Sequence, residues 1–481
     1  MKLNIPIILL CLILCFTAGC AQVNSTTTTT LPAGETYPAD SSYDDAVGIY
    51  VSTAGNDSTG NGSIGNPYRT IQHVLTNIAV SGDIIVLRGG TYNENIDIRV
   101  ANITIRSKND EWANIQSPTG DSSINQTVRF NIDAGWSSSG GKLYRLEIIG
   151  GYYYAVKFET MWDWGGADRS GVSSVTIEAC KIHDTGRDCV KVTPNCDDIR
   201  IINCEIYNSG LRDNSNAEGI DNVNGDRMIV ADCKIHDIAT NGLYFKGGAT
   251  DCVAERNTIY NCGGAGILLG FDTSPEFFDL AVNPQYFENI NGIARNNIVY
   301  NTQNSGIGMY AAKNPQVLNN TIVNAAQTYH SPIYFGLTFQ DWDADAGRPA
   351  SEGAVIKNNI AVSNSPDSYG VYIRYASDLG GMNAYSGLPT MGHNRYFKLG
   401  GGTLVFVDQR PASTFSGGLS GWQSHISGDA NSAEGDPDLD GAYHLNTGSP
   451  CVDAGETISS VAYDIDKQAR SSPYDIGADE K

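Results

Sequence analysis

The sequence predicts an all-β chain wound into a parallel β-solenoid, in which short strands stack coil upon coil. Two observations on the residues predict this fold: a Gly-hydrophobic phrase recurs between residues 155 and 373, and a second phrase with a fixed Asn or Cys accompanies it. Composition agrees, because Gly is abundant (53 residues) and charged residues make up only 17% of the chain. Self-similarity at a fixed period is the mark of repeat architectures, and this composition suits a turn-rich β protein.

The first phrase predicts short strands with one face inside the solenoid. The side chains at positions one and three after its first residue are mostly apolar and alternate with outward ones, as in a half-buried strand. The shortest coils are 23 and 24 residues long (219 to 242 and 242 to 266). The first residues of the phrase, called position zero, are Ala155, Cys189, Gly219, Gly242, Gly266, Gly306, Pro332 and Gly370.

The second phrase, for example MIVADCKIHD or PQVLNNTIVN, predicts an inside corner of the solenoid. One column in it reads Cys180, Cys204, Cys233, Asn257, Asn297, Asn320 and Asn359. Stacked Asn side chains hydrogen-bond along a ladder at the strand spacing of roughly 4.8 Å, and the cysteines continue it as small buried residues. The KIHD stretches at 181–184 and 234–237 are interpreted as a surface ladder away from the functional face.

Charge and cysteine usage exclude two classes. The 481-residue chain carries a formal charge of −22, which should repel nucleic acid and gives no general attraction to an acidic polysaccharide. Bound cations are its natural complement. No CxxC pair occurs, so a structural zinc site is not expected.

The N-terminus predicts export and anchoring. Residues 1–19 read as a signal peptide, because a lysine precedes an apolar run too short to span a membrane. Thr17-Ala18-Gly19-Cys20 resembles a bacterial lipobox, which implies lipidation of Cys20, and residues 20–47 read as a Thr-rich tether. We expect an exported monomer, held on the outer or cytoplasmic membrane or the cell surface only through this lipid.

We expect the β-helix to span residues 48–400, followed by a capping region over residues 401–481. Within the β-helix, differences in coil length locate the functional face. The spacing from position zero to the Asn/Cys column is 14 or 15 residues in four coils but 25, 31 and 27 in three others, and residues 211–218 add a loop on the other side. Loop insertions on both sides of one sheet predict a groove with that sheet as its floor. The inserted loops carry aromatic residues such as Trp342, which suit stacking on sugar rings.

Charged side chains converge on this floor in three consecutive coils. Asp188 and Glu218 stand just before position zero, and Asp221 stands at position two. The outward residues at position two are Lys157, Lys191, Asp221, Tyr244, Leu268, Gly308, Tyr334 and Tyr372; those at position four are Glu159, Thr193, Val223, Lys246, Gly270, Tyr310, Gly336 and Arg374.

The opening stretch YVSTAGNDSTGNGSIGNPYRTIQHVL…GDIIVLRGGTY resembles the N-terminal coil of secreted right-handed parallel β-helix polysaccharide lyases. The tail GDPDLDGAYHLNTGSPCVDAG…DIGADE resembles a C-terminal pattern of bacterial β-helix surface proteins. The charged coils are most similar to family 9 polysaccharide lyases. That resemblance implies calcium held by Asp188, Glu218 and Asp221, and a lysine base at position two. Here position two of the coil after Asp221 is Tyr244, and Lys191 comes one coil before.

The resemblance leaves three functions open. The first is a lyase that cleaves a pectate-like uronate polymer by calcium-assisted β-elimination, with Lys191 or else Lys246 as the base. Lys191 can serve only if its pKa falls, which neighbouring Lys157 and calcium favour and Asp221 opposes. Expected substrate-binding residues are Lys157, Tyr244, Tyr310, Trp342 and Arg374.

The second function is a glycoside hydrolase with Glu218 and either Asp221 or Asp188 as its two carboxylates. The third is a non-catalytic glycan-binding or structural protein of the cell surface. A plain salt-bridge ladder between Lys191 and Asp221 on a solvated face is the competing interpretation of the charged coils.

Overall fold

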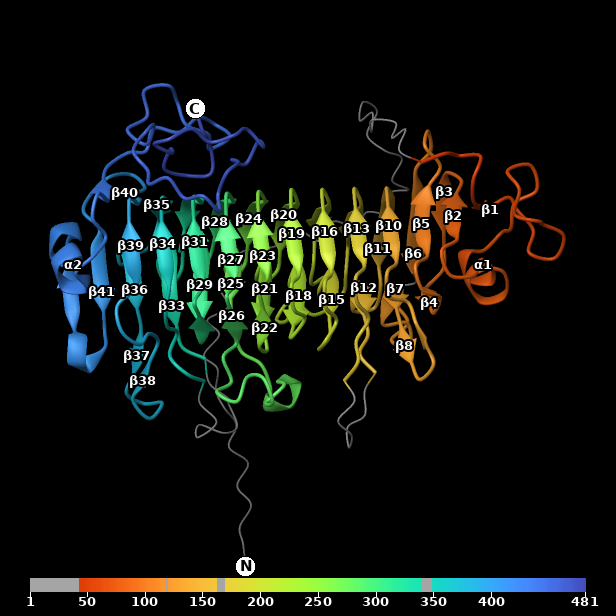
Figure 1. Cartoon of the computed structure of the whole chain (residues 1–481), viewed down its shortest axis with the longest axis horizontal. Helices are drawn as coiled ribbons and strands as arrows, with labels where there is room; N and C mark the ends of the chain where they lie inside the picture. The colour runs from red at the N-terminus through yellow and green to blue at the C-terminus, as the bar shows by residue number, and fades with distance from the viewer. Residues whose placement is uncertain (1–42, 118–119, 162–168, 339–347) are drawn as a thin grey trace, which may run out of the picture. The chain divides into compact units, whose positions relative to one another are not determined.

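The computed structural model in Figure 1 describes residues 43–117, 120–161, 169–338 and 348–481. All of them belong to the second of two compact units, which spans Tyr43–Lys481. The expected signal peptide, Cys20 and most of the tether lie outside the described residues, as does Trp342. In the part of the chain that the structure describes, no helix is long and apolar enough to cross a membrane.

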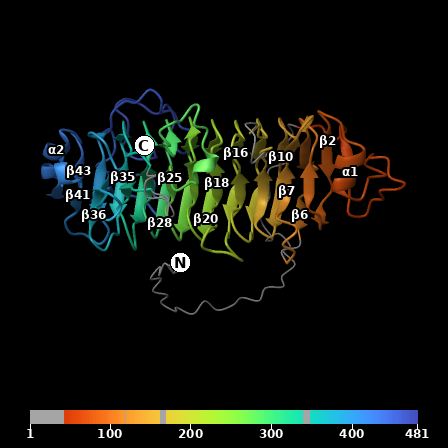
Figure 2. The ribbon, with the colours of Figure 1, turned by 90° about the horizontal axis from the view of Figure 1, so that it is seen from below.

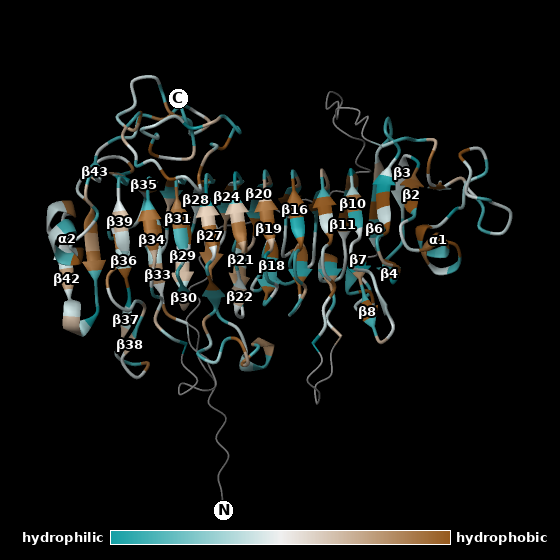
Figure 3. Cartoon of the chain, viewed as in Figure 1, coloured by the Kyte–Doolittle hydropathy of each residue, from teal (hydrophilic) through white to brown (hydrophobic). Residues whose placement is uncertain are grey.

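The predicted right-handed parallel β-helix is confirmed. Three sheets run along one axis, and within the described residues each contains 12 strands, almost all of them parallel. Each full coil contributes one strand to each sheet, and Figure 3 shows hydrophobic residues recurring on the strands along the whole stack.

The first sheet consists of β1 (Ile49–Val51), β2 (Ile84–Leu87), β5 (Thr104–Ser107), β10 (Lys142–Tyr144), β13 (Thr176–Glu178), β16 (Arg200–Ile202), β19 (Ile229–Ala231), β23 (Val253–Glu255), β27 (Ile293–Arg295), β31 (Gln316–Leu318), β34 (Val355–Lys357) and β39 (Thr390–Gly392). The second sheet consists of β3 (Gly90–Tyr92), β6 (Ala113–Ser117), β11 (Leu146–Gly150), β14 (Lys181–His183), β17 (Glu205–Tyr207), β20 (Lys234–Ile238), β24 (Thr258–Cys262), β28 (Ile298–Thr302), β32 (Thr321–Ala325), β35 (Ile360–Ser363), β40 (Arg395–Lys398) and β43 (Ala433–Glu434).

The third sheet, which carries the charged coils, consists of β4 (Ile96–Ile98), β7 (Gln126–Phe130), β12 (Tyr154–Phe158), β15 (Val190–Val192), β18 (Ile220–Val223), β21 (Leu243–Lys246), β25 (Ile267–Leu269), β29 (Ile307–Tyr310), β33 (Ile333–Gly336), β36 (Tyr369–Ile373), β41 (Val405–Asp408) and β42 (Phe415–Gly417). Minor pairings join β22 (Ala249–Thr250), β26 (Asn289–Ile290) and β30 (Ala312–Lys313), then β8 (Ile132–Asp133) with β9 (Trp136–Ser137), and β37 (Tyr375–Ala376) with β38 (Met382–Asn383).

Short helices close the two ends of the stack (Figures 1 and 2). Helix α1 (Ile71–Asn77) begins after Thr70, whose hydroxyl accepts the His73 N–H, and it buries Ile71 and Val74. Helix α2 (Leu419–Ile426) buries Trp422 at the other end. A solenoid needs such caps because its end coils would otherwise expose the core. Two short 3-10 helices, η1 (Pro275–Phe277) and η3 (Pro411–Ser413), lie in loops.

The strands of the expected capping region continue the sheets, since β41 and β43 pair in parallel with β36 and β40. The chain after β43 then folds back along the stack, where Leu445, Cys451 and Ile476 pack against Val323 and Ile360. Figure 1 shows this last segment along one edge and the loops that follow the third-sheet strands along the opposite edge.

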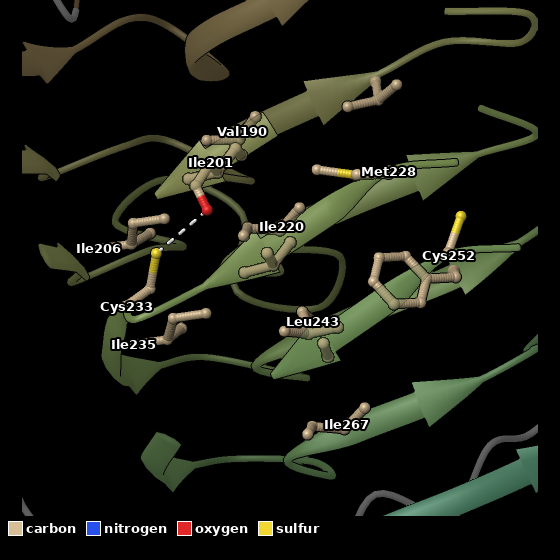
Figure 4. Packing of buried hydrophobic residues seen from close by; sticks show 14 of the residues in the cluster. Val190, Ile201, Ile206, Ile220, Met228, Cys233, Ile235, Leu243, Cys252 and Ile267 are labelled. Carbon is tan, nitrogen blue, oxygen red and sulfur yellow. Dashed lines mark hydrogen bonds between the residues drawn. The ribbon is translucent and has the colours of Figure 1, made fainter. Parts of the chain in front are cut away.

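The interior of the stack contains the side chains predicted to point inward. Val190, Ile220, Leu243 and Ile267 come from successive third-sheet strands and are fully buried, as Figure 4 shows. The eight cysteines in the described residues are all free and buried, which agrees with a packing role; Cys233 donates to the Ile201 carbonyl (3.5 Å).

The predicted Asn ladder is confirmed. Nδ2 of Asn257 donates to Oδ1 of Asn297 (3.0 Å), and Asn297 donates in the same way to Asn320 (2.9 Å). Asn320 donates to Asn359 (3.0 Å), and Asn359 to Asn394 (3.1 Å), which extends the column by one coil. All five side chains are fully buried, so every amide in the ladder depends on its neighbours.

We expect Asn297→Ala to lower the free energy of unfolding by about 1–3 kcal/mol, because it removes the oxygen that accepts the buried backbone N–H of Asn257 (3.0 Å) and a hydrogen bond from its Nδ2. Thermal unfolding followed by circular dichroism measures the effect. Asn93→Ala, at an exposed position, is the matched control with a smaller loss. Equal midpoints for wild type and Asn297→Ala would contradict the structural role of the ladder.

The KIHD histidines belong to a stacked aromatic ladder on the second sheet, as expected. His183 stacks on Tyr207 (4.5 Å between ring centroids), Tyr207 on His236 (5.1 Å) and His236 on Tyr260 (4.8 Å). His183 Nε2 lies 2.9 Å from Glu147, and its Nδ1 lies 3.2 Å from Asp184. Burial opposes the charge of His183, but these two carboxylates prevail and raise its pKa from 6.5 to about 9.

This raised pKa predicts a pH dependence of stability. The folded state binds the His183 proton more tightly than the unfolded state, so the stabilisation is complete below pH 6.5 and disappears as the pH rises through about 9. The loss is at most about 3 kcal/mol. In His183→Gln the thermal midpoint should depend less on pH in this window, whereas His73→Gln should behave as wild type. A wild-type midpoint that rises from pH 6.5 to 9 would contradict the prediction.

Candidate functional site

The register of the third sheet brings the predicted charged residues together. Lys157 pairs with Lys191, Lys191 with Asp221, and Asp221 with Tyr244, each one coil apart. The outward face of each strand therefore forms the continuous column that the repeat predicted. Since inward neighbours such as Val190 and Ile220 are fixed in the core, the outward side chains are held in this order.

Asp188, Glu218 and Asp221 form one buried acidic cluster. Each offers a carboxylate oxygen, and these oxygens lie within 4.8 Å of one another. Asp188 Oδ1 accepts the backbone N–H of Glu218 (3.1 Å), and Glu218 Oε1 accepts from the Thr240 hydroxyl (2.8 Å). Burial, followed by the charges of Asp221 and Glu218, raises the pKa of Asp188 well above its usual value.

Lys191 is the cation of this cluster. Its Nζ donates to Asp221 Oδ2 in a short ion pair, with Asp221 almost fully buried. Burial acts to lower the pKa of Lys191, but the charges of Asp221 and Asp188 outweigh it and raise the pKa above the ordinary 10.5. The same partner holds the pKa of Asp221 below its usual value in spite of burial.

The ion pair between Lys191 and Asp221 affects whether Lys191 can act as a base. Lys157 and a bound calcium ion were both expected to lower the pKa of Lys191, but Lys157 Nζ pairs with Glu159 (2.8 Å), which weakens the first of these influences. The influence of Asp221 therefore dominates, and Lys191 is protonated at neutral pH. The base role of Lys191 stays a prediction, and the ion pair counts against it because only an uncharged amine can accept a proton.

Lys246 lies one coil beyond Asp221 and contacts other groups. Its Nζ donates to the Asp272 carbonyl (2.9 Å) and lies 4.5 Å above the Tyr244 ring and 5.8 Å above that of Phe271. Tyr244 is only 1% exposed beneath these side chains, so it supports the floor instead of presenting a free ring face.

The acidic cluster fits a calcium ion. Calcium takes hard oxygen ligands, and three carboxylates on one face provide them. Oδ1 of Asp221 is buried and makes no hydrogen bond within the described residues, which leaves it available as a ligand. Three carboxylates against one ammonium group also leave a negative charge that a divalent cation would compensate.

The predicted groove continues from the cluster along the third sheet. A cavity of ≈ 450 Å³ reaches from Glu218 past Phe271 and Tyr310 to His330 and Arg374. Loop residues border it on both sides, among them Ser215 before β18 and Thr338 after β33. The coils of Glu218 and His330 are four strands apart, roughly 19 Å at the usual strand spacing. This length suits an extended polymer, and the volume lies in the range of ligand sites.

Two glycines make room for the floor of this groove. A Cβ at Gly336 would meet Cε1 of Tyr310 at 2.0 Å, and one at Gly308 would meet its Cε2 at 3.0 Å. The Tyr310 ring therefore lies flat across the next strands, 7% exposed, and packs edge-on against Tyr334.

His330 was not anticipated from the sequence. It precedes Pro332, a position zero of the repeat, and so falls outside the outward columns at positions two and four. The signal that could have identified it is its place three residues before β33, a strand that borders the groove, in the turn that carries the acidic residues of earlier coils.

Comparison with known proteins agrees with this architecture. The family model described as the right-handed β-helix region matches residues 166–336. The solved structure of the pectate lyase Pel9A is similar with a TM-score of 0.54 at 16% identity, over 90% of this chain and 96% of that one. The chain is a right-handed parallel β-helix protein.

Other β-helix structures are similar at lower TM-scores. A rhamnogalacturonan lyase has a TM-score of 0.49 at 14% identity, over 68% of this β-helix chain and 84% of its own. The A-module of the mannuronan C-5 epimerase AlgE6 from Azotobacter vinelandii has a TM-score of 0.49 at 12% identity, over 74% and 91%. No curated protein matches the sequence. The resemblance of the C-terminal tail to surface proteins stays a prediction.

Proposed function

We propose that this β-helix protein is a polysaccharide lyase that cleaves a uronate-containing polymer by calcium-assisted β-elimination. The observation that carries the proposal is the buried cluster of Asp188, Glu218 and Asp221 at one end of an open groove. A pectate lyase is among the proteins of similar fold, and its name agrees with a uronate substrate.

β-Elimination requires neutralisation of the uronate carboxylate, a base for the proton on C5, and departure of O4. Calcium, when bound, supplies positive charge that neutralises a carboxylate of the polymer. The cluster residues hold the ion, and Lys191 holds Asp221 in place. Arg374 provides further positive charge beside the floor, and Tyr310 forms its apolar part.

The hydrolase alternative fits this geometry less well. Hydrolases need two carboxyl groups about 5–5.5 Å apart, or about 6.5–9.5 Å apart where water attacks directly. In this cluster all three carboxylates are buried, and Asp221 is already paired with Lys191.

A screen of the mature protein against polyuronates, with calcium and with a chelator, tests the proposal. A lyase yields an unsaturated product that absorbs in the ultraviolet, and calcium should increase its rate of formation. New reducing ends without this absorbance would show a hydrolase. Retained polymer binding without any product would show a binding protein.

We also propose that Cys20 anchors the exported protein to a membrane through a lipid. The Cys20→Ser variant should be released from the membrane fraction or remain unprocessed. Fractionation identical to that of the wild type would reject the anchor.

A further inference from the structure

His330 lies at the end of the groove opposite the acidic cluster, and among the described residues no group binds its ring nitrogens. Nδ1 is buried without a hydrogen-bond partner, and within the described residues Nε2 makes no hydrogen bond either. The ring stacks on Tyr334 with 3.8 Å between centroids. The backbone φ is 76°, a left-handed conformation that costs a non-Gly residue energy.

Arg374 lines the same end of the cavity and is free to bind an anion. In the described ranges it forms no ion pair, although the chain carries 53 Asp and Glu residues. Its guanidinium lies close enough to His330 and Tyr334 to affect the pKa of both. An arginine without a carboxylate of its own, at the end of a groove, is suited to a ligand carboxylate.

The reaction requires an uncharged base, and His330 meets this requirement. Burial and then the charge of Arg374 lower the pKa of His330 to about 4, so the imidazole is neutral at pH 7. Of the two ring nitrogens of His330, the buried Nδ1 is out of reach, which leaves Nε2 for a ligand.

We propose, on the basis of the lyase function argued above, that His330 is the base that accepts the C5 proton of a uronate whose carboxylate binds Arg374. The C5–H bond breaks and its proton passes to Nε2 of His330. The electron pair forms the C4=C5 double bond, and the C4–O4 bond breaks with its pair on O4, which takes a proton from water. The acidic cluster, roughly 19 Å away, then holds a second carboxylate of the same polymer.

The charges around His330 predict a distinctive pH profile. Arg374 and the phenols of Tyr334 and Tyr310 face it, and Glu218 and Asp272 line the far part of the cavity. In the free enzyme kcat/KM should rise with pH through about 4 and then stay level. A bound uronate compensates the Arg374 charge, so the acid limb of kcat should lie at higher pH than that of kcat/KM. A lysine base would instead give a rate still rising above pH 9.

The test is His330→Gln, with His393→Gln as the matched control, because His393 also has a left-handed backbone (φ 54°) but does not line the groove. We expect kcat of His330→Gln to fall roughly 100- to 10,000-fold, with binding of the uncut polymer and the thermal midpoint nearly unchanged. His393→Gln should keep the wild-type kcat. Arg374→Met should raise KM and lower kcat together.

The outcomes separate this proposal from the function on which it rests. If the wild type forms no unsaturated product from any polyuronate, the lyase function fails and His330 loses its role with it. If the wild type forms product and a folded His330→Gln retains full kcat, only the assignment of the base is overturned. His330→Asn provides a second variant should the first not fold.

Discussion

Replacing Arg348 by methionine is expected to destabilise the groove wall by about 3–5 kcal/mol, because it leaves a buried carboxylate without its cation. Arg348 Nε donates to Glu288 Oε1 (2.9 Å), and both side chains are completely buried. Glu288 also accepts from the Gly247 N–H (2.9 Å) and the Thr273 hydroxyl (2.7 Å). The Arg348 guanidinium also lies 4.7 Å above the Phe278 ring. The ion pair with Glu288 therefore fixes the loop around Phe278 to Gly247, the residue after β21.

The loss should appear first as local opening, since coils of a solenoid contact only their neighbours. Hydrogen exchange should accelerate across residues 247–290, and the thermal midpoint should fall. Burial already raises the pKa of the Glu288 carboxyl. The loss of stability in Arg348→Met should therefore grow as the pH rises, because a larger fraction of the unpaired Glu288 carboxyl becomes charged.

Matched variants separate the buried charge from simple loss of contact. Arg348→Met combined with Glu288→Gln should recover much of the stability, because no unpaired charge remains. Arg227→Met, which breaks exposed pairs with Asp197 and Asp198, should cost less than about 1 kcal/mol. An Arg348→Met effect as small as that of Arg227→Met would show that the ion pair does not hold the loop.

The fold and the acidic cluster were predictable because both follow from register. Once Val190, Ile220 and Leu243 are fixed inward, the residues between them must point outward, and Lys191, Asp221 and Tyr244 must stack one coil apart. Asp188 and Glu218 then meet Asp221, as their positions in the repeat predicted. The Asn column was predictable for the same reason, since a ladder needs one residue type at one position of each coil.

Side-chain partners inside a column were harder to predict. The sequence shows that Lys191 lies between Lys157 and Asp221, but not which of these two neighbours has the larger effect on the pKa of Lys191. The structure pairs Lys157 with Glu159 on its own strand, so Lys191 belongs to Asp221. His330 could not be placed, because its role depends on a turn conformation and on Arg374, which lies 44 residues later in the chain.

Asp221→Asn is expected to abolish the response to calcium, while Lys191→Met strengthens it. The amide introduced by Asp221→Asn would offer one neutral oxygen in place of a carboxylate, whereas removal of the Lys191 ammonium leaves three carboxylates that repel one another until a cation binds. The rise in thermal midpoint on adding calcium, and calorimetric titration with calcium alone, should therefore change in opposite directions in the two variants. In the presence of calcium, kcat/KM of Asp221→Asn should fall about 100-fold, mainly through a higher KM, because the variant loses the cation that binds a second carboxylate of the polymer.

The same pair of variants also tests Lys191 as the base. Lys191→Met should retain turnover within a few-fold of wild type, since a protonated lysine accepts no proton. Lost turnover in Lys191→Met, with calcium and polymer still bound, would instead make Lys191 the base that the family 9 resemblance implies. An unchanged calcium response in Asp221→Asn would show that the cation binds elsewhere, and the ion pair of Lys191 and Asp221 would then be a purely structural rung of the ladder.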